Sequence, residues 1–380
     1  MKIWLSAGEA SGDLHGAALA ATLRRQRPDI ELAGMGGDAM LASGVDVRWH
    51  IRDNSVMGFW EVITHLPALF RLKADITNAM AAEKPDALVI IDYPDFNSRL
   101  AKAAQKLGIP VLSFISPAAW AWRPGRAKKT AAIVNQVAAI FPFEYDIYRD
   151  AGADTVFVGH PLLDVVRPSE RPAAALRKEL NIEAKTPVLL LLPGSRRQEI
   201  AHQLELMLTA AAILQRQIPD LSVLLLQAST IDKAELEPSI KRIFPKTKLV
   251  QAQGTAIYDM MKMSDVAIAT SGTVTLEAAL CGLPTVIVYR TSPLTAWIAL
   301  RLLRIAHIGL PNIVANKRIF PELLQEKVTP ENMAHEAAAL LEPKRREAVL
   351  ADLLIVREKL GEPGAVGRVA QLAIQLAQKK

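Results

Sequence analysis

The sequence predicts an α/β protein built from two Rossmann-like domains, each a doubly wound parallel sheet covered by helices on both faces. Short apolar segments rich in Val, Ile and Leu alternate with helical patterns along most of the chain, which is typical of βαβ units. A polar, proline-containing stretch at 164–185 interrupts the alternation, which then starts again. A length of 380 residues also exceeds what one hydrophobic core usually serves.

The predicted strands follow this rhythm in chain order. In the first half they are 2–7, 29–34, 87–91, 109–114, 136–141 and 155–158, with helical patterns at 13–25, 96–107 and 126–134. In the second half they are 187–192, 222–226, 248–251, 266–269 and 285–289. The predicted domains are therefore 1–165 and 166–354, and we expect the helices at about 355–380 to pack back on the first domain or on a partner subunit.

Ligands of such parallel sheets bind beyond the carboxyl ends of the strands. With two domains of this kind, we expect the site in the interdomain cleft.

Composition narrows the class of partner. The net charge is +6 and the pI is near 9.3, which suits nucleic acid, anionic lipid or phosphorylated small molecules. Nucleic acid is disfavoured, because only 5% of the residues are aromatic and no zinc-finger spacing occurs. The single Cys281 excludes an internal disulfide and favours a reducing compartment. No apolar run reaches the roughly 18–20 residues of a membrane span.

The first predicted strand is followed by Gly8-Glu-Ala-Ser-Gly-Asp13. Its glycines allow close backbone approach, and the helix that follows presents free N–H groups to an anion. The alternative is an ordinary tight turn with Ser11 as the helix cap.

The third predicted strand ends in Ile91-Asp-Tyr-Pro-Asp-Phe-Asn97. Asp92 and Asp95 thus stand at a carboxyl end, where Asp95 can accept a proton from an attacking hydroxyl as a general base. The alternative is that Asp95 only caps the helix that starts at Phe96.

Two segments of the second half suit a nucleotide diphosphate. Leu192-Pro-Gly-Ser-Arg-Arg197 combines a helix entrance with two guanidinium groups. Ser271-Gly-Thr-Val-Thr-Leu-Glu277 offers donors at a helix start and a carboxylate that can accept the two hydroxyls of a ribose. The alternatives are a surface arginine pair and a capped helix with Glu277 exposed. No Asp-x-Asp triplet occurs, so the carboxylate pair that would hold Mg²⁺ is missing, and Arg196 and Arg197 would neutralise the diphosphate.

Three further segments suit a membrane surface. Apolar residues alternate with Trp and Arg at 56–70 and at 297–304, and aromatic and cationic residues gather at 120–129. For the first two segments, the alternative of core-facing amphipathic helices is the commoner case. The third would grip a phosphorylated headgroup.

Taken together, the motifs resemble lipid-A-disaccharide synthases. The resemblance extends over nearly the whole chain and is carried by six segments in order: Gly8–Asp13, Ile91–Asn97, Val158-Gly-His-Pro-Leu162, Leu192-Pro-Gly-Ser-Arg196, Ser271–Glu277 and Leu310-Pro-Asn312.

The resemblance implies a glycosyltransferase B fold and an inverting, metal-independent hexosyltransferase. Its reaction would transfer 2,3-diacylglucosamine from UDP-2,3-diacylglucosamine to 2,3-diacylglucosamine 1-phosphate (lipid X), giving the β-1′,6-linked lipid A disaccharide 1-phosphate and UDP. No cofactor is implied, because the UDP-sugar is the donor substrate. The implied location is cytoplasmic, peripheral on the inner face of the inner membrane, and a homodimer is compatible with it.

The resemblance also assigns roles to residues. Asp95 would be the general base and Arg196 would stabilise the leaving diphosphate. The expected substrate-binding residues are Glu9, Ser11, Asp13, Asp92, Asn97, Arg197, Ser271, Gly272, Thr273, Glu277 and Asn312. The chain departs from the family pattern at Tyr93, where a smaller residue is expected, and at Arg197, where glycine is frequent.

Two other readings remain. One is another B-fold UDP-sugar enzyme, an epimerase or a cell-wall glycosyltransferase. The other is a non-catalytic nucleotide-binding peripheral membrane protein, which would leave the paired Asp92 and Asp95 unexplained.

Overall fold

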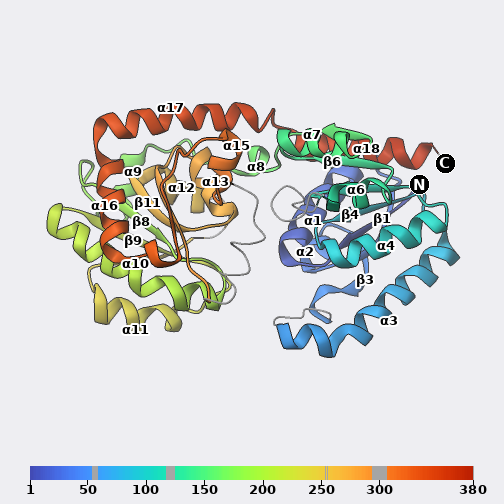
Figure 1. Cartoon of the computed structure of the whole chain (residues 1–380), viewed down its shortest axis with the longest axis horizontal. Helices are drawn as coiled ribbons and strands as arrows, with labels where there is room; N and C mark the ends of the chain where they lie inside the picture. Colours follow the sequence, from blue (N-terminus) through green and yellow to red (C-terminus); the bar gives the residue numbers. More distant parts are fainter. Residues whose placement is uncertain (54–58, 117–124, 253, 255, 293–305, 380) are drawn as a thin grey trace. The chain divides into compact units, whose positions relative to one another are not determined.

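The structure is a computed structural model that describes residues 1–53, 59–116, 125–252, 254, 256–292 and 306–379, with only the backbone for 53 and 59–66. The chain divides into two compact units (Figure 1). Unit 1 comprises Met1–Pro161 and Gly361–Lys380, and unit 2 comprises Leu162–Leu360. The segment that returns to unit 1 therefore begins at Gly361, a few residues later than the sequence pattern suggested.

Within the described part of unit 1, a parallel sheet has the strand order β3-β2-β1-β4-β5-β6-β7. Its strands are β1 (Lys2–Ala7), β2 (Glu31–Gly36), β3 (Asp46–His50), β4 (Ala87–Ile91), β5 (Val111–Phe114), β6 (Gln136–Ala139) and β7 (Thr155–Phe157). The helices are α1 (Ala10–Gln26), α2 (Asp38–Ala42), α3 (Phe59–Glu83), α4 (Pro94–Lys106), α6 (Gly125–Ala131), α7 (Pro142–Asp150) and α18 (Ala365–Gln378), with a 3₁₀ turn at Ile51–Asp53.

The sheet of unit 1 is buried on both faces. All five residues of β4 are buried, as expected for a central parallel strand. One face packs under α3 and α4 around Trp4, Ile76 and Leu100. Helices α1 and α18 lie against the other face, so that the end of the chain returns to the domain in which it began (Figure 1). This arrangement leaves the carboxyl ends of the strands free to carry a site.

Within the described part of unit 2, a second parallel sheet has the order β10-β9-β8-β11-β12-β13. Its strands are β8 (Val188–Leu192), β9 (Ser222–Gln227), β10 (Lys248–Gln251), β11 (Val266–Thr270), β12 (Thr285–Tyr289) and β13 (Glu322–Leu324). The helices are α8 (Leu162–Val165), α9 (Ala173–Glu179), α10 (Arg197–Gln217), α11 (Lys233–Ile243), α12 (Ala256–Met263), α13 (Thr273–Leu280), α15 (Leu310–Ala315), α16 (Pro330–Leu341) and α17 (Pro343–Lys359), with a 3₁₀ turn at Gln325–Lys327.

The core of unit 2 follows the same plan. The central strands β8 and β11 are buried throughout. One face packs against α9 and α12 around Leu190, Met261 and Ala267, and α10 and α16 cover the other. None of the helices built from described residues is both long enough and apolar enough to cross a membrane.

Candidate functional site

The predicted motifs of unit 1 meet at one edge of its sheet. Strands β1 and β4 are neighbours, and their last residues, Ala7 and Ile91, pair in register. The β1–α1 loop and the β4–α4 loop therefore leave the sheet side by side. Ser6 and Asn97 join the two directly, because the Ser6 hydroxyl donates to Asn97 Oδ1 at 2.7 Å.

The β4–α4 loop turns sharply in an unusual backbone conformation. Asp92 and Tyr93 both have left-handed φ angles, of 49° and 50°, and Pro94 then opens α4. Each left-handed residue that is not glycine costs roughly 1–2 kcal/mol. Strain of this kind persists where the surrounding structure fixes it, which is frequent at functional sites.

The side chain of Asn97 fixes this turn through hydrogen bonds to its backbone. This side chain is 1% exposed. Its amide Nδ2 donates to the carbonyls of Ser6 at 3.1 Å and Asp92 at 2.8 Å, and also lies within hydrogen-bonding distance of the Ile91 carbonyl. Because these bonds engage its polar atoms with the loop itself, Asn97 supports the site.

The two predicted carboxylates differ in environment. The side chain of Asp95 is 90% exposed, and Arg126 Nη2, from α6, lies 3.1 Å from Asp95 Oδ1. Asp92 is half-buried, and burial raises its pKa. Asp95 thus stands open to a substrate hydroxyl, while Asp92 is closer to the sheet.

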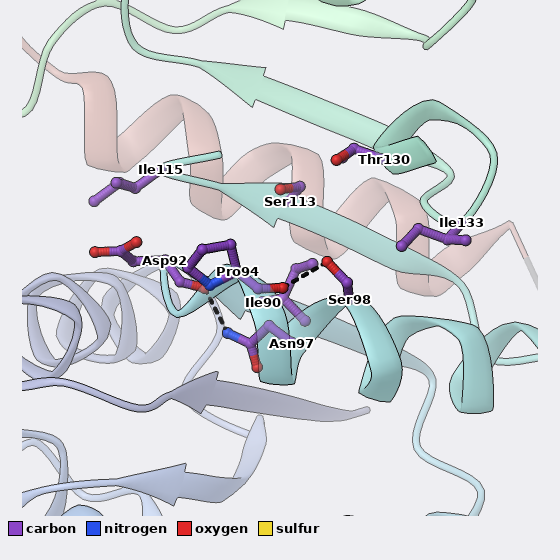
Figure 2. A pocket seen from close by; sticks show the side chains of 9 residues that line it. All are labelled: Ile90, Asp92, Pro94, Asn97, Ser98, Ser113, Ile115, Thr130 and Ile133. Atoms are coloured by element: carbon purple, nitrogen blue, oxygen red, sulfur yellow. Dashed lines mark hydrogen bonds between the residues drawn. The ribbon is translucent and has the colours of Figure 1, made fainter. Parts of the chain in front are cut away.

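A small pocket opens beside this turn, between β4, β5, α4 and α6 (Figure 2). Asp92 and Ile115 lie towards one end of it, and Thr130 and Ile133 towards the other. Its polar lining includes Asp92, Ser98, Ser113 and Thr130. The turn therefore borders a recess in which polar side chains are available.

The buried network beneath this pocket consists of hydroxyl groups. The hydroxyls of Ser113 and Ser116 are 2.8 Å apart, and those of Ser116 and Thr130 hydrogen-bond with the fully buried Tyr148. Burial, followed by the charge of Glu144, raises the pKa of Tyr148. The network stays neutral and fixes the ends of β5 and α6.

The β1–α1 loop places its three predicted residues differently. Glu9 and Ser11 are exposed at the start of α1. Asp13 is 6% exposed, and its carboxylate accepts the backbone N–H groups of Gly37 at 2.7 Å, Ala39 at 3.0 Å and Met40 at 3.1 Å. Asp13 therefore fastens the β2–α2 turn to α1, whereas Glu9 and Ser11 are exposed at the surface.

Two histidines at this edge had no role assigned from the sequence. His160, after β7, is 5% exposed and packs 4.7 Å from the ring of Phe141. Burial, with a smaller contribution from the charge of His15, lowers its pKa to about 3. Burial also lowers the pKa of His15, whose ring meets Phe114 edge-on. Both imidazole rings are therefore neutral near pH 7. The sequence feature that could have pointed to His160 is its place in the Val158–Leu162 motif.

In unit 2, the β8–α10 loop carries the predicted arginines. Glu199 Oε2 accepts the backbone N–H groups of Ser195 and Arg196, while Arg196 Nη1 lies 3.1 Å from Glu199 Oε1. The side chains of Arg196 and Arg197 are 76% and 81% exposed, and Arg197 pairs with Glu235. Glu199 thus engages the N–H groups of Ser195 and Arg196, whereas both guanidinium groups are largely exposed.

The β11–α13 loop lies beside it, because Leu192 and Ala269 pair between β8 and β11. Gly272 and Thr273 are exposed, and Ser271 is half-buried. Glu277, one turn into α13, is half-buried, and burial raises its pKa. Burial, together with the charge of Glu277, raises the pKa of Tyr258 to about 12.

Asn312 holds the next segment of the same edge. It is fully buried. Its Nδ2 donates to the Phe320 carbonyl at 2.9 Å and to Glu322 Oε1 at 2.8 Å, and its Oδ1 accepts the N–H groups of Ile319 and Phe320. Asn312 therefore shapes the segment before β13 with both of its polar atoms engaged.

The predicted membrane-binding segments are described only in part. Val56–Gly58 and Trp297–Arg304 lie outside the described residues, as does the 117–124 stretch that contains the two tryptophans of the third segment. Among the described residues of that segment, Lys128 and Lys129 are exposed on α6. No group of three or more His, Cys, Asp or Glu side chains within the described part of the chain is placed to hold a metal ion.

Known proteins resemble this chain over its whole length. A family model described as lipid-A-disaccharide synthetase matches residues 3–371. Lipid-A-disaccharide synthase from Syntrophus aciditrophicus is 41% identical over 99% of this chain and 98% of its own length. The enzyme of that name from Geobacter metallireducens is 40% identical over 100% and 98%.

Solved structures resemble it in fold. UDP-GlcNAc 2-epimerase from Neisseria meningitidis, bound to UDP-GlcNAc, superposes with a TM-score of 0.64 at 11% identity, covering 100% of both chains. The glycotransferase of kitacinnamycin superposes with a TM-score of 0.63 at 15% identity, covering 99% of this chain and 98% of its own. At such identities the likeness concerns the fold alone, which is the glycosyltransferase B fold.

Proposed function

Because the chain belongs to the lipid-A-disaccharide synthase family of glycosyltransferases, we propose that it joins two acylated glucosamines. The donor is UDP-2,3-diacylglucosamine and the acceptor is 2,3-diacylglucosamine 1-phosphate (lipid X). The products are the β-1′,6-linked disaccharide 1-phosphate and UDP. The observation that carries the proposal is Asp95, an exposed carboxylate at the carboxyl end of β4 in a chain that matches this family from end to end.

Asp95 acts on the acceptor in this proposal. The 6-hydroxyl oxygen of the acceptor attacks C1 of the donor sugar, and its proton passes to the Asp95 carboxylate. The bond between C1 and the diphosphate oxygen breaks, and UDP leaves with the electron pair. Attack from the face opposite the leaving group inverts the anomeric centre.

Unit 2 holds the donor. The exposed guanidinium of Arg196 neutralises the charge that develops on the leaving diphosphate, with Arg197 beside it. Glu277 accepts the ribose hydroxyls, and Ser271, Gly272 and Thr273 line the same helix entrance. Two arginines supply the positive charge that a metal ion would otherwise bring, so the transfer requires no metal.

The remaining predicted residues divide into two groups. Glu9, Ser11 and Asp92 bind the acceptor from the edge of unit 1. Asp13, Asn97 and Asn312 support the loops, since their polar atoms are engaged with backbone. The acyl chains require a lipid surface, so we place the protein peripherally on the cytoplasmic face of the inner membrane, a location with which a homodimer is compatible.

A UDP-release assay tests the proposal. Purified protein receives both lipids, either one alone, or neither, with EDTA present throughout. Release that requires both lipids and survives EDTA supports the transfer. Conversion of UDP-GlcNAc without an acceptor would favour an epimerase instead, and UDP binding without release under any condition would favour a non-catalytic nucleotide-binding protein.

A further inference from the structure

Tyr93 occupies the space that a side chain at position 8 would need. A Cβ built on Gly8 would lie within 2.5 Å of three atoms of the Tyr93 ring, Cγ, Cδ1 and Cε1. Gly8 has no left-handed φ angle, so its own backbone does not require a glycine. The requirement comes from the ring, which rests directly on the backbone of the β1–α1 loop.

The backbone conformation of Tyr93 and a contact with Phe96 also hold the ring in this position. Tyr93 follows β4 with a φ angle of 50°, which directs its side chain away from the course a right-handed residue would give it. Its ring centroid lies 5.6 Å from that of Phe96, a residue of the core under α4. Tyr93 therefore bridges the β1–α1 and β4–α4 loops with a rigid aromatic group.

Each of those two loops carries an exposed carboxylate. Glu9 follows Gly8, and Asp95 lies two residues beyond Tyr93. Burial raises the pKa of Tyr93, and the negative charges of Glu9 and Asp95 raise it further. The ring belongs to one loop and lies against the backbone of the other, so it sets how far apart the two loops stand.

We propose that Tyr93 is a positioning residue for the acceptor, whose ring fixes the spacing between Glu9 and Asp95 at which the acceptor sugar binds. This inference rests on the proposed function and adds a residue to it. Glu9 and Asp95 accept hydroxyls of the sugar, and the spacing decides whether the 6-hydroxyl reaches Asp95. The aromatic ring of Tyr93, and not its hydroxyl, sets this spacing, because ring atoms make the contact with Gly8.

The test is a double-mutant cycle between Gly8 and Tyr93 in the full-length enzyme, assayed by UDP release. Gly8→Ala alone collides with the ring and should lower kcat/KM for the acceptor about tenfold. Tyr93→Ala should raise the acceptor KM by a similar factor and leave the donor KM unchanged. Adding Gly8→Ala to Tyr93→Ala should cost less than about twofold, because the methyl group then fills vacated space.

Three controls separate positioning from general damage. Tyr93→Phe keeps the ring and should retain kcat/KM within about threefold. Gly125→Ala, whose added Cβ has no described residue within 4 Å, should be neutral. Tyr145→Phe removes a phenolic hydroxyl elsewhere in the same unit, on α7, and serves as the control for Tyr93→Phe. If Gly8→Ala fails to fold, the double variant should recover folding and show the activity of Tyr93→Ala.

The outcomes are distinct. Additive losses from Gly8→Ala and Tyr93→Ala, or equal changes in donor and acceptor KM, would overturn the role of Tyr93 while wild-type transfer stands. Absence of transfer by the wild type would instead overturn the proposed function itself, and this inference with it.

Discussion

Arg126 and Asp95 form an ion pair across two helices, with Arg126 Nη2 3.1 Å from Asp95 Oδ1. Asp95 is in the first turn of α4 and Arg126 is at the start of α6. The carboxylate is almost fully exposed, so this arginine is what restrains its orientation. An exposed pair of this kind contributes about 0–1 kcal/mol, which suits a role in aiming the base more than one in stability.

We therefore expect Arg126→Ala to lower kcat about three- to tenfold with little change in Tm. Arg126→Lys should recover part of the rate, because a cation remains although the geometry of the guanidinium is lost. The matched control is Arg149→Ala, which removes an exposed arginine paired with Asp146 and Asp150 in the same unit. A kcat unchanged by Arg126→Ala would show that Asp95 needs no such restraint.

Glu277 should discriminate nucleotides by their sugar. A carboxylate that accepts the ribose hydroxyls contributes about 1.5–3 kcal/mol. Glu277→Ala is therefore expected to weaken UDP binding roughly 10- to 100-fold and to abolish the preference for UDP over 2′-deoxy-UDP. Titration calorimetry measures both nucleotides, and Glu331→Ala, an exposed acid of α16, is the control. Equal loss for both nucleotides with the preference retained would exclude the ribose contact.

Asn312 should matter for folding before it matters for binding. Its removal leaves the buried N–H groups of Ile319 and Phe320 without their acceptor, at about 1–3 kcal/mol each. Asn312→Ala should thus destabilise unit 2 by at least about 2 kcal/mol, visible as a Tm lower by roughly 4 °C or more. Asn332→Ala, at an exposed position of α16, should change little. Wild-type Tm with weakened UDP binding would indicate direct substrate contact.

His160 makes stability depend on pH in a defined direction. Its pKa falls from about 6.5 in the unfolded chain to about 3 in the folded one. Between these two pKa values the unfolded chain binds more protons than the folded one. The contribution of His160 to the free energy of unfolding is therefore complete above pH 6.5 and is lost as the pH falls. Burial raises the pKa of Asp92 and Glu277, and their contributions have the opposite sign, being lost as the pH rises.

His160→Gln isolates the histidine contribution. Urea unfolding of wild type at pH 7.0, 6.0 and 5.0 should show a loss approaching roughly 1.4 kcal/mol per pH unit from this one proton. The free energy of unfolding of His160→Gln should fall less steeply with pH over the same range, by the amount that His160 contributes to the wild type. Parallel pH profiles for the two proteins would mean that His160 is protonated in the folded state.

The sequence predicted the central strands, and with them the loops at their carboxyl ends, for a physical reason. Strands buried on both faces, such as β4 and β8, read as uninterrupted apolar runs. The edge strands β3 and β13 lack that signal. The predictions omitted β3 (Asp46–His50), in which no residue is fully buried, and β13, which has only three residues.

Supporting and binding residues look alike in sequence. Asp13 and Glu9 occupy one motif, yet Asp13 points its carboxylate into the β2–α2 turn, 24 residues or more away in the chain. Asn97 likewise donates to the Ser6 carbonyl, 91 residues away in the chain, and Asn312 accepts the N–H group of Phe320, eight residues further along. The left-handed turn at Asp92 and Tyr93 is not encoded by a turn residue such as glycine. The capture of the Ser195 and Arg196 N–H groups by Glu199 is a local capping contact that the sequence predictions omitted.

The most direct test of the account measures turnover and UDP affinity side by side for Asp95→Ala. If Asp95 is the base for the acceptor and unit 2 holds the donor, turnover should fall roughly 10²–10⁴-fold while the Kd for UDP stays within about twofold of wild type. Arg196→Ala in the same experiment should lower turnover comparably and weaken UDP binding as well. If Asp95→Ala keeps more than about a tenth of the wild-type rate, Asp95 is not the base.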